Sequence, residues 1–301
     1  MSNNVLVDLS DALASAAEQA GKATVLVNAR RRLPGSGVAY AGDLILTADH
    51  ILEREEEITI LAADGTETAA KLAGRDPGSD LALLRLERSA LTAATPAPDK
   101  ARIGQLALVL GRPSEEGLQA SLGVISAIGG PLRTGQGALL ERYIRTDAIS
   151  YPGFSGGPLV DASGQVLGIN TSGLARGMPL TIPTELAWQV AASLAAHGHV
   201  RRAYLGIRSQ SVEVPASAQK GLKREQAEGL LIVGVEADSP ASGGELMVGD
   251  ILVGIAGSPV RNHDELYAQL SEARIGVSTP IELLRAGQPK VVKVTVGERK
   301  P

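Results

Sequence analysis

Short apolar runs separated by turns dominate the first two thirds of the chain. Residues 6–20 are an exception, because their leucines and alanines recur at helical spacing and predict a helix. From about residue 23 the spacing changes to that of β-strands. Strands are expected at residues 23–27, 44–47, 58–61, 81–86, 106–110, 122–128, 143–146 and 166–170. Since almost no helix intervenes, the pattern predicts antiparallel barrels rather than a parallel α/β sheet.

A different pattern follows near residue 184. A helix is expected over residues 184–197, with Pro183 suited to its first turn and Gly198 to its end. Further elements are strands at 230–235, 250–255, 280–284 and 291–296, and a helix at 263–273 with Asn262 as its cap. About a hundred residues of mixed strand and helix form one small α+β domain. The chain therefore divides into a helical segment at 1–22, a β domain at 23–200 and a second domain at 203–301.

Composition narrows the possible chemistry. The chain has 301 residues, of which only 2% are aromatic, so aliphatic side chains must form the core. A net charge of −4 gives no basic surface for nucleic acid, and we expect no nucleic-acid partner. The absence of cysteine excludes disulfides, thiolate metal sites and a cysteine nucleophile. His197 and His199 lack a third ligand, so neither a metal nor another cofactor is expected.

The N-terminal residues give one expectation about location. They show neither a basic region followed by an apolar stretch nor any segment long enough to span a membrane. The residues alone therefore leave two alternatives, a cytoplasmic protein or an exported protein whose export segment is missing from this sequence.

A glycine-rich segment at residues 151–158 surrounds Ser155. A serine hydroxyl attacks a carbonyl only when a base takes its proton and hydrogen-bond donors stabilise the oxyanion. The neighbouring glycines let the backbone N–H groups of Gly153 and Ser155 point at one oxygen. Ser155 is therefore the candidate nucleophile.

The candidate base and its partner lie in the first half of the chain. His50 follows the apolar strand at 44–47, where an imidazole can project into a cleft. Asp80 precedes the strand at 81–86 and can hold an imidazole in one tautomer. Three other aspartates fit this role less well: Asp49 points the other way along its strand, Asp76 forms a turn and Asp147 braces the serine loop.

The sequences around these residues resemble the HtrA (Deg) family, trypsin-like serine proteases that carry a PDZ domain at the C-terminus. The order His50, Asp80, Ser155 is that of chymotrypsin-type enzymes. The matching segments are Gly35-Ser36-Gly37-Val38, Ile45 to His50, Arg75 to Leu84, Thr146-Asp147-Ala148, Pro152 to Leu159, Gly168 to Thr171, Tyr204 to Ile207, Asp238-Ser239-Pro240 and Val248 to Leu252. Two features depart from the family: Phe154 replaces an asparagine, and no aromatic residue precedes Tyr40.

The resemblance implies a mainly β fold, a chymotrypsin-like double antiparallel β-barrel followed by a small PDZ domain. It implies a serine endopeptidase with His50, Asp80 and Ser155 as the catalytic triad and an oxyanion hole at Gly153 and Ser155. The family degrades unfolded or damaged proteins during stress, is found in the periplasm or cell envelope, and often forms homotrimers through N-terminal aromatics. We carry these properties over as expectations.

The resemblance also indicates where substrate binds. Ile149, six residues before Ser155, takes the position of the pocket floor, and an apolar floor favours small or medium aliphatic side chains. The backbone of Thr171, Ser172 and Gly173 is expected to pair with the substrate. In the PDZ domain, peptide C-termini are expected at Tyr204, Leu205, Gly206 and Ile207, opposite a wall formed by Leu266 and Leu270.

Two other readings remain. Gly153-x-Ser155-x-Gly157 also matches the nucleophile elbow of α/β-hydrolases, but that fold needs a helix directly after the serine, and Pro158 and a hairpin pattern disfavour it. A catalytically silent peptide-binding chaperone or sensor is the second alternative, because Phe154 departs from the family's sequence.

Overall fold

A computed structural model describes residues 4–88, 91–134, 139–175, 178–222, 224–270 and 272–299. Residues 1–3 of the expected N-terminal segment and position 271 of the expected second-domain helix lie outside these ranges. The chain divides into two compact units, and the boundary between them along the sequence falls between Val200 and Arg201.

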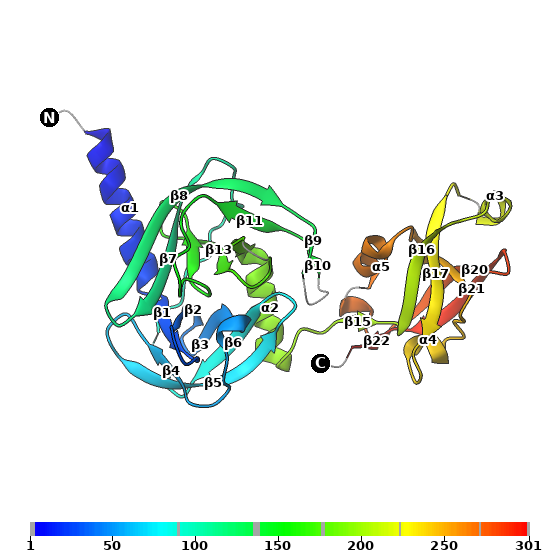
Figure 1. The fold of residues 1–301 in the computed structure, drawn as a ribbon, viewed down its shortest axis with the longest axis horizontal. Coiled ribbons are helices and arrows are strands. Elements are labelled where there is room, and N and C mark those ends of the chain that lie inside the picture. The colour runs from blue at the N-terminus through cyan, green and yellow to red at the C-terminus, as the bar shows by residue number, and fades with distance from the viewer. Residues whose placement is uncertain are drawn as a thin grey trace. The chain divides into compact units, whose positions relative to one another are not determined.

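The first unit begins with helix α1 (Val5–Gly21) and a closed barrel of six antiparallel strands (Figure 1). These strands are β1 (Thr24–Asn28), β2 (Gly35–Ala41), β3 (Leu44–Ala48), β4 (Ile58–Leu61), β5 (Glu67–Asp76) and β6 (Leu81–Leu86). Their order around the barrel is β1-β2-β3-β6-β5-β4. Aliphatic side chains such as Val25, Ile45 and Leu84 fill the interior, as a sequence poor in aromatics requires.

A second closed barrel follows, with the order β11-β14-β13-β12-β7-β8. Its strands are β7 (Leu106–Ser114), β8 (Gly117–Gly129), β11 (Tyr143–Thr146), β12 (Pro158–Val160), β13 (Val166–Thr171) and β14 (Leu180–Pro183), with a hairpin of β9 (Leu132–Arg133) and β10 (Leu139–Leu140) beside them. Helix α2 (Thr184–His197) is followed by its C-cap residue Gly198, whose φ of 76° is left-handed. The predicted double antiparallel barrel is confirmed.

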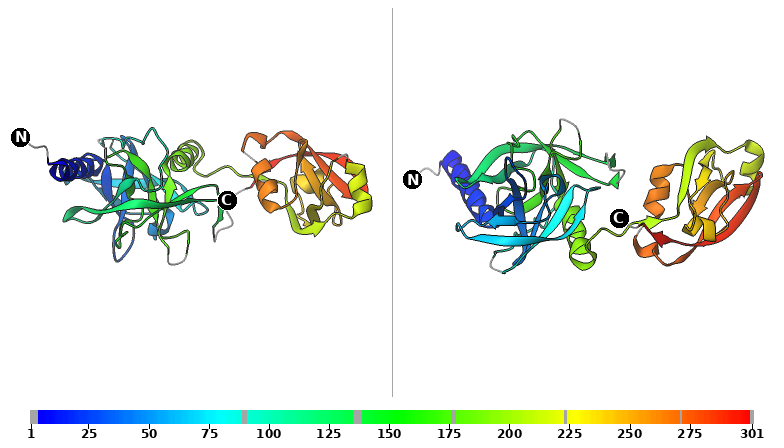
Figure 2. Two further views of the ribbon diagram at one scale, coloured as in Figure 1. Left: turned by 90° about the horizontal axis from the view of Figure 1, so that it is seen from above. Right: turned by 60° about the horizontal axis from the view of Figure 1, so that its bottom comes forward.

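The two ends of α1 have different surroundings. Ala16 and Ala20 belong to a buried cluster that also includes residues of both barrels and of α2. Val5 and Leu6 are exposed, and the first turns of the helix project from the barrels (Figure 2). In the described part of the protein, no helix combines the length and the apolar character that crossing a membrane requires.

The second unit contains a five-strand path, β16-β17-β18-β20-β21, in which β16 is an edge strand. Its elements are β15 (Ala203–Tyr204), β16 (Ile207–Glu213), α3 (Ala216–Gln219), β17 (Glu228–Val235), α4 (Pro240–Gly243), β18 (Ile251–Ile255), β19 (Ser258–Pro259), α5 (His263–Gln269), β20 (Ser278–Arg285), β21 (Gln288–Thr295) and β22 (Gly297–Glu298). Asn262 caps α5 as predicted, accepting the N–H of Glu265 at 2.9 Å. The helix ends at Gln269 instead of 273, because Leu270 leaves helical geometry (φ −88°, ψ 62°) and packs against the core.

Candidate active site

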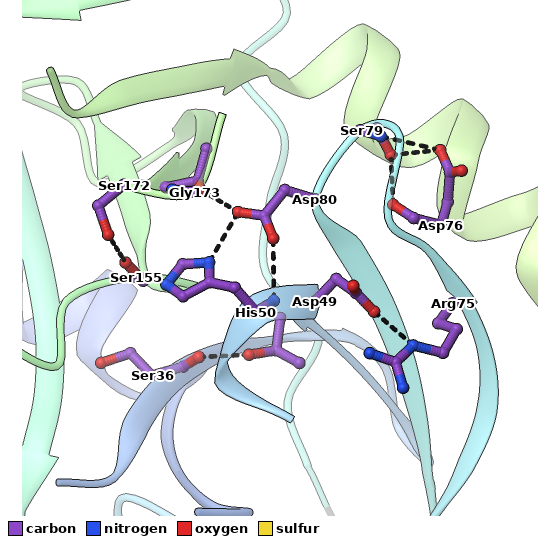
Figure 3. A network of polar contacts seen from close by, with 12 residues as sticks. Ser36, Asp49, His50, Arg75, Asp76, Ser79, Asp80, Ser155, Ser172 and Gly173 are labelled. Atoms are coloured by element: carbon purple, nitrogen blue, oxygen red, sulfur yellow. Dashed lines mark hydrogen bonds and ion pairs between the residues drawn. The ribbon is translucent and has the colours of Figure 1, made fainter. Parts of the chain in front are cut away.

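Strand pairing in the first barrel brings His50 and Asp80 together. Strands β3 and β6 are antiparallel, with Ala48 opposite Leu81. His50 lies in a short 3-10 turn directly after β3, and Asp80 directly precedes β6. The His50 Nδ1 atom is 2.8 Å from Asp80 Oδ2, and the His50 backbone N–H donates to Asp80 Oδ1 at 2.9 Å (Figure 3). One carboxylate therefore holds both the ring and the backbone of the histidine.

The geometry of Asp80 is unusual for a residue other than glycine. Its φ is 56°, a left-handed conformation that is costly for most side chains and recurs at functional sites. Asp76 stabilises the preceding turn, since its carboxylate accepts the backbone N–H of Ser79 at 3.1 Å and the Ser79 hydroxyl at 2.6 Å. The hydroxyl of Thr171, at the end of β13, also donates to Asp80 Oδ2. Because the Asp80 carboxylate accepts a hydrogen bond from Nδ1 of His50, it favours the imidazole tautomer that carries its proton on Nδ1 and leaves Nε2 unprotonated.

Asp49 faces away from this pair as expected, although it lies in the 3-10 turn after β3 and not on a strand. The Nε atom of Arg75 donates to Asp49 Oδ1 at 2.7 Å. This hydrogen bond raises the pKa of Arg75, and a second one to Glu55 adds to the effect. Asp49 is thus engaged in an ion pair with Arg75.

Ser155 lies in the loop between β11 and β12. Hydrogen bonds to both barrels hold this loop in place. Its carbonyl accepts the N–H of Ser36 from the first barrel at 3.0 Å. The N–H of Gly156 donates to Asn170 of the second barrel at 2.8 Å. Gly156 has a φ of 87°, and a Cβ atom there would collide with the carbonyl of Ser36. A glycine after the serine is therefore required by both conformation and space.

The hydroxyl of Ser155 has a neighbour that the sequence did not predict. Its Oγ is 3.1 Å from the Oγ of Ser172, and among the described residues no hydrogen bond joins it to His50. Figure 3 shows the imidazole of His50 lying between Asp80 and Ser155. The Ser155 hydroxyl is therefore paired with Ser172, and not with His50, in this structure.

Two backbone N–H groups of this loop, those of Gly153 and Ser155, have no acceptor among the described residues. The N–H of Phe154 donates to Tyr151 at 3.0 Å and closes a turn with Pro152 and Gly153 at its centre. The φ of 85° at Gly153 identifies a type II turn. The Phe154, Gly156 and Gly157 N–H groups all have acceptors, whereas those of Gly153 and Ser155 have none in the described structure.

Ser36 connects this turn to the rest of the protein, a role that was not predicted from the sequence, where Ser36 is placed only in a family segment. Its buried hydroxyl donates to the carbonyl of Gly153 at 2.7 Å and accepts the backbone N–H of Arg112 at 2.8 Å. The Arg112 guanidinium in turn donates to the carbonyls of Thr24 (3.0 Å) and Gly21 (3.4 Å), at the end of α1. Burial lowers the pKa of Arg112. The only signal in the sequence is a serine between two glycines.

Phe154 holds the same loop by apolar packing. Its side chain is fully buried in a cluster of the second barrel that includes Val109 and Leu159. Its ring meets that of Tyr151 edge-on, with centroids 5.4 Å apart. Gly111 makes room for it, since a Cβ atom there would lie 2.6 Å from the Phe154 ring. The departure from the family's asparagine is therefore accommodated by the barrel core.

The expected substrate positions differ in their surroundings. Thr171 pairs with Leu180 within the barrel, and Ser172 and Gly173 after it are exposed. A Cβ atom at Gly173 would lie 2.5 Å from Asp80 Oδ2 and 2.8 Å from His50 Nδ1, so this segment borders the histidine–aspartate pair. Ile149 is 57% exposed, and its N–H donates to the hydroxyl of Ser121 at 2.9 Å. Its apolar surface is thus open to solvent.

In the second unit, the segment 204–207 leads into the edge strand β16. Gly206 has a φ of 82°, and the N–H groups of Leu205 and Gly206 donate no hydrogen bond within the described structure. Leu266 is buried in the core and Leu270 packs against it. His263, at the start of α5, lies 3.2 Å from the hydroxyl of Ser209 on β16. The edge strand and α5 therefore run beside each other.

The side chains of Tyr204 and Leu205 in this segment are held in different ways. The Tyr204 hydroxyl donates to the carboxylate of Glu236, and this bond raises the pKa of Tyr204. Leu205 is only 2% exposed, so its side chain belongs to the core of the unit. Among the described residues, no group of three or more histidine, cysteine, aspartate or glutamate side chains is arranged to hold a metal ion.

Comparison with known proteins agrees with this architecture. Residues 35–169 match the trypsin-like peptidase domain family, and residues 203–296 match the PDZ domain family. The fold and these matches define a trypsin-like serine peptidase followed by a PDZ domain.

Similar proteins refine this class. The HtrA-type protease AlgW, solved with a decapeptide, is 31% identical and has a TM-score of 0.80, covering 96% of this chain and 99% of that one. A probable periplasmic serine endoprotease, DegP-like, from Ectopseudomonas mendocina is 34% identical over 87% of this chain and 56% of its own length. The periplasmic pH-dependent serine endoprotease DegQ of Escherichia coli is 34% identical over 87% and 59%, respectively. The chain belongs to the HtrA family of serine endopeptidases, and it spans a little over half the length of these curated relatives.

Proposed function

We propose that this protein cleaves internal peptide bonds with Ser155 as nucleophile, His50 as general acid–base and Asp80 as the residue that orients the imidazole. The observation that carries the proposal is the His50–Asp80 contact of 2.8 Å beside a serine loop held by both barrels. The strained backbone of Asp80 supports it, because strain of this kind persists where the surrounding structure enforces a functional geometry.

The reaction proceeds by acyl transfer. When a substrate strand occupies the segment 171–173, the Ser155 hydroxyl turns from Ser172 to His50 Nε2, which takes its proton as Oγ attacks the scissile carbonyl. The N–H groups of Gly153 and Ser155 receive the oxyanion. The imidazolium, stabilised by Asp80, then donates the proton to the departing amine. Water attacks the acyl-enzyme in the same way, with His50 again as base, and restores the free serine.

We infer that cleavage follows small or medium aliphatic residues. The position six residues before the nucleophile is Ile149, whose side chain offers apolar surface and no charge to a lysine or arginine. Mapping of the cleavage sites in a denatured protein is expected to show cuts after valine, alanine, leucine and isoleucine. Cuts mainly after lysine or arginine would contradict this specificity.

The second unit is proposed to bind peptide C-termini, with residues 203–301 as the binding domain. The unoccupied N–H groups of Leu205 and Gly206 suit a terminal carboxylate, and the edge strand β16 suits strand addition. Peptides ending in valine, leucine or alanine are expected to bind as free acids and to lose affinity as C-terminal amides. Equal affinity for acid and amide would refute carboxylate capture.

The biological substrates are proposed to be unfolded or damaged proteins in the periplasm. The support is family membership and the names of the curated relatives, which are periplasmic endoproteases. Assembly into a homotrimer stays a family-based proposal.

Casein degradation tests the proposed activity directly. The wild-type protein is expected to degrade casein, and Ser155→Ala to fold normally and leave casein intact. Degradation by the Ser155→Ala variant would refute the role of this serine. A wild-type protein that binds casein without cleaving it would instead favour the catalytically silent scaffold, a reading that the Ser155–Ser172 hydrogen bond supports.

A further inference from the structure

A cavity of about 430 Å³ lies between the outer face of the first barrel and the β7–β8 hairpin. Leu26 and Leu61 are paired on β1 and β4, and both line it. Their neighbours Val25, Val27 and Ile60 fill the barrel interior, so strand alternation directs Leu26 and Leu61 outward. The cavity therefore has an apolar base that the barrel core does not use.

This cavity adjoins the turn that carries the unoccupied N–H group of Gly153. Pro34 and Pro113 line the cavity, and both approach Gly153 closely. A Cβ atom at Gly153 would lie 2.6 Å from Pro113 and 2.9 Å from the carbonyl oxygen of Pro34. The segment proposed to hold the acyl part of the substrate is a different one. Its residue Ser172 contacts Ser155 itself. A peptide running from Ser172 past Ser155 therefore reaches the cavity after the scissile bond.

The polar groups of the cavity are acidic. Glu67, Glu115 and Glu116 line it, and no lysine or arginine is among its lining residues. None of the three carboxylates has an ion-pair partner within the described structure. Arg30 donates hydrogen bonds to the carbonyls of Leu33 and Pro34, which belong to one wall of the cavity. Its positive charge weakens the negative electrostatic potential of the carboxylates.

The apolar and acidic parts of the lining come from different elements. Leu26 and Leu61 belong to β1 and β4, whereas Glu115 and Glu116 form the turn between β7 and β8. An apolar base beneath carboxylates matches a residue with a long aliphatic stem and a cationic end.

We propose that this cavity is a specificity subsite on the leaving-group side, and that it takes the side chain of a lysine or arginine that follows the scissile bond. The proposal rests on the proposed endopeptidase activity. It makes the two sides of the cleft chemically different, since the acyl side is apolar at Ile149 and the leaving-group side is acidic.

Quenched fluorogenic peptides with a fixed acyl half test the subsite. Lysine or norleucine, which has a similar stem without the charge, is placed in turn at each of the first three positions after the scissile bond, with alanine elsewhere. At one position kcat/KM is expected to be about 5- to 10-fold higher for lysine, the effect of one or two solvent-exposed ion pairs. The preference should decrease at high salt.

Matched variants assign the effect to the cavity. Glu115→Gln/Glu116→Gln is expected to bring the lysine-to-norleucine ratio close to one and to leave kcat/KM of the norleucine peptide unchanged. Glu56→Gln/Glu87→Gln removes the same charge from exposed positions outside the cavity and should keep the preference. A ratio near one at all three positions in the wild type, or an equal loss in both double variants, overturns the proposal.

A binding measurement separates this inference from the proposed function. The same peptides are titrated against Ser155→Ala, which binds without turnover. If wild-type protein cleaves none of them while Ser155→Ala still binds the lysine peptide more tightly, the proposed activity fails and the subsite stands. Cleavage of all peptides without any lysine preference would contradict the proposed subsite and would leave the proposed activity supported.

Discussion

Replacing Ser36 with alanine removes the hydroxyl that holds the carbonyl of Gly153. The substitution leaves two buried groups without a partner, the Gly153 carbonyl (2.7 Å from the hydroxyl) and the Arg112 N–H (2.8 Å). Each such loss costs about 1–3 kcal/mol, so we expect about 2–6 kcal/mol of destabilisation in total. The type II turn then loses the bond that fixes its orientation.

The kinetic effect follows from that turn. Loss of one oxyanion donor typically lowers kcat by about 10²–10³-fold, and partial misorientation of Gly153 should lower it by about 10- to 100-fold. KM should change little, because the segment 171–173 is untouched. A peptide boronate, whose tetrahedral adduct uses the same donors, should lose affinity in parallel with kcat/KM.

Thr184→Val is the matched control. It removes another buried hydroxyl, which donates to the carbonyl of Val166 at 2.7 Å at the start of α2. It should destabilise the protein by about 1–2 kcal/mol without changing kcat or boronate affinity. If Ser36→Ala lowers kcat no more than Thr184→Val does, or leaves boronate affinity unchanged, Ser36 does not position the oxyanion turn.

Three further predictions concern other parts of the structure. Phe154→Ala should lower the free energy of unfolding by about 3–5 kcal/mol in urea titrations, as expected for a fully buried phenylalanine, and an effect below about 1 kcal/mol would contradict the packing described. Gly173→Ala places a Cβ atom 2.5 Å from Asp80 and should reduce kcat by about 100-fold, whereas unchanged kcat would show that the segment can move freely. Burial acts to raise the pKa of Asp250, but the hydrogen bonds from Arg285 and from the backbone N–H of Met247, and the positive charges of Arg285 and Lys290, together hold the pKa below its usual value. The resulting stability of the second unit is therefore present above the unfolded-state pKa and lost as pH falls through the folded-state pKa, and hydrogen exchange should show this acid dependence in wild type and a weaker one in Arg285→Gln.

The fold could be predicted from the sequence because its signals are local. Short apolar runs with turns between them define the strands, and Asn262 and Gly198 mark helix ends within a few residues. The end of α5 was predicted too late, because Leu270 leaves the helix to pack against the core and no local signal encodes that contact.

The candidate site could be predicted from the sequence only in part. His50, Asp80 and Ser155 each lie in a distinctive short segment, but their proximity depends on the register of β3 and β6 and on loops held by both barrels. The bonds of Ser36 to Gly153 and of Thr171 to Asp80 join residues far apart in the sequence, so no spacing rule reveals them. From the sequence, Ser36 is placed only in a family segment and the backbone of Thr171 is given a role in substrate pairing, so neither side-chain bond was predicted.

The most direct test of the central proposal is to map where a fluorophosphonate attaches. Two hydroxyls lie 3.1 Å apart in the candidate site, so peptide mapping by mass spectrometry must distinguish Ser155 from Ser172. We predict a single adduct on Ser155 in wild type and in Ser172→Ala, and none in Ser155→Ala or His50→Ala. An adduct on Ser172, or labelling of Ser155 that is as fast in His50→Ala as in wild type, would contradict the assignment of nucleophile and base.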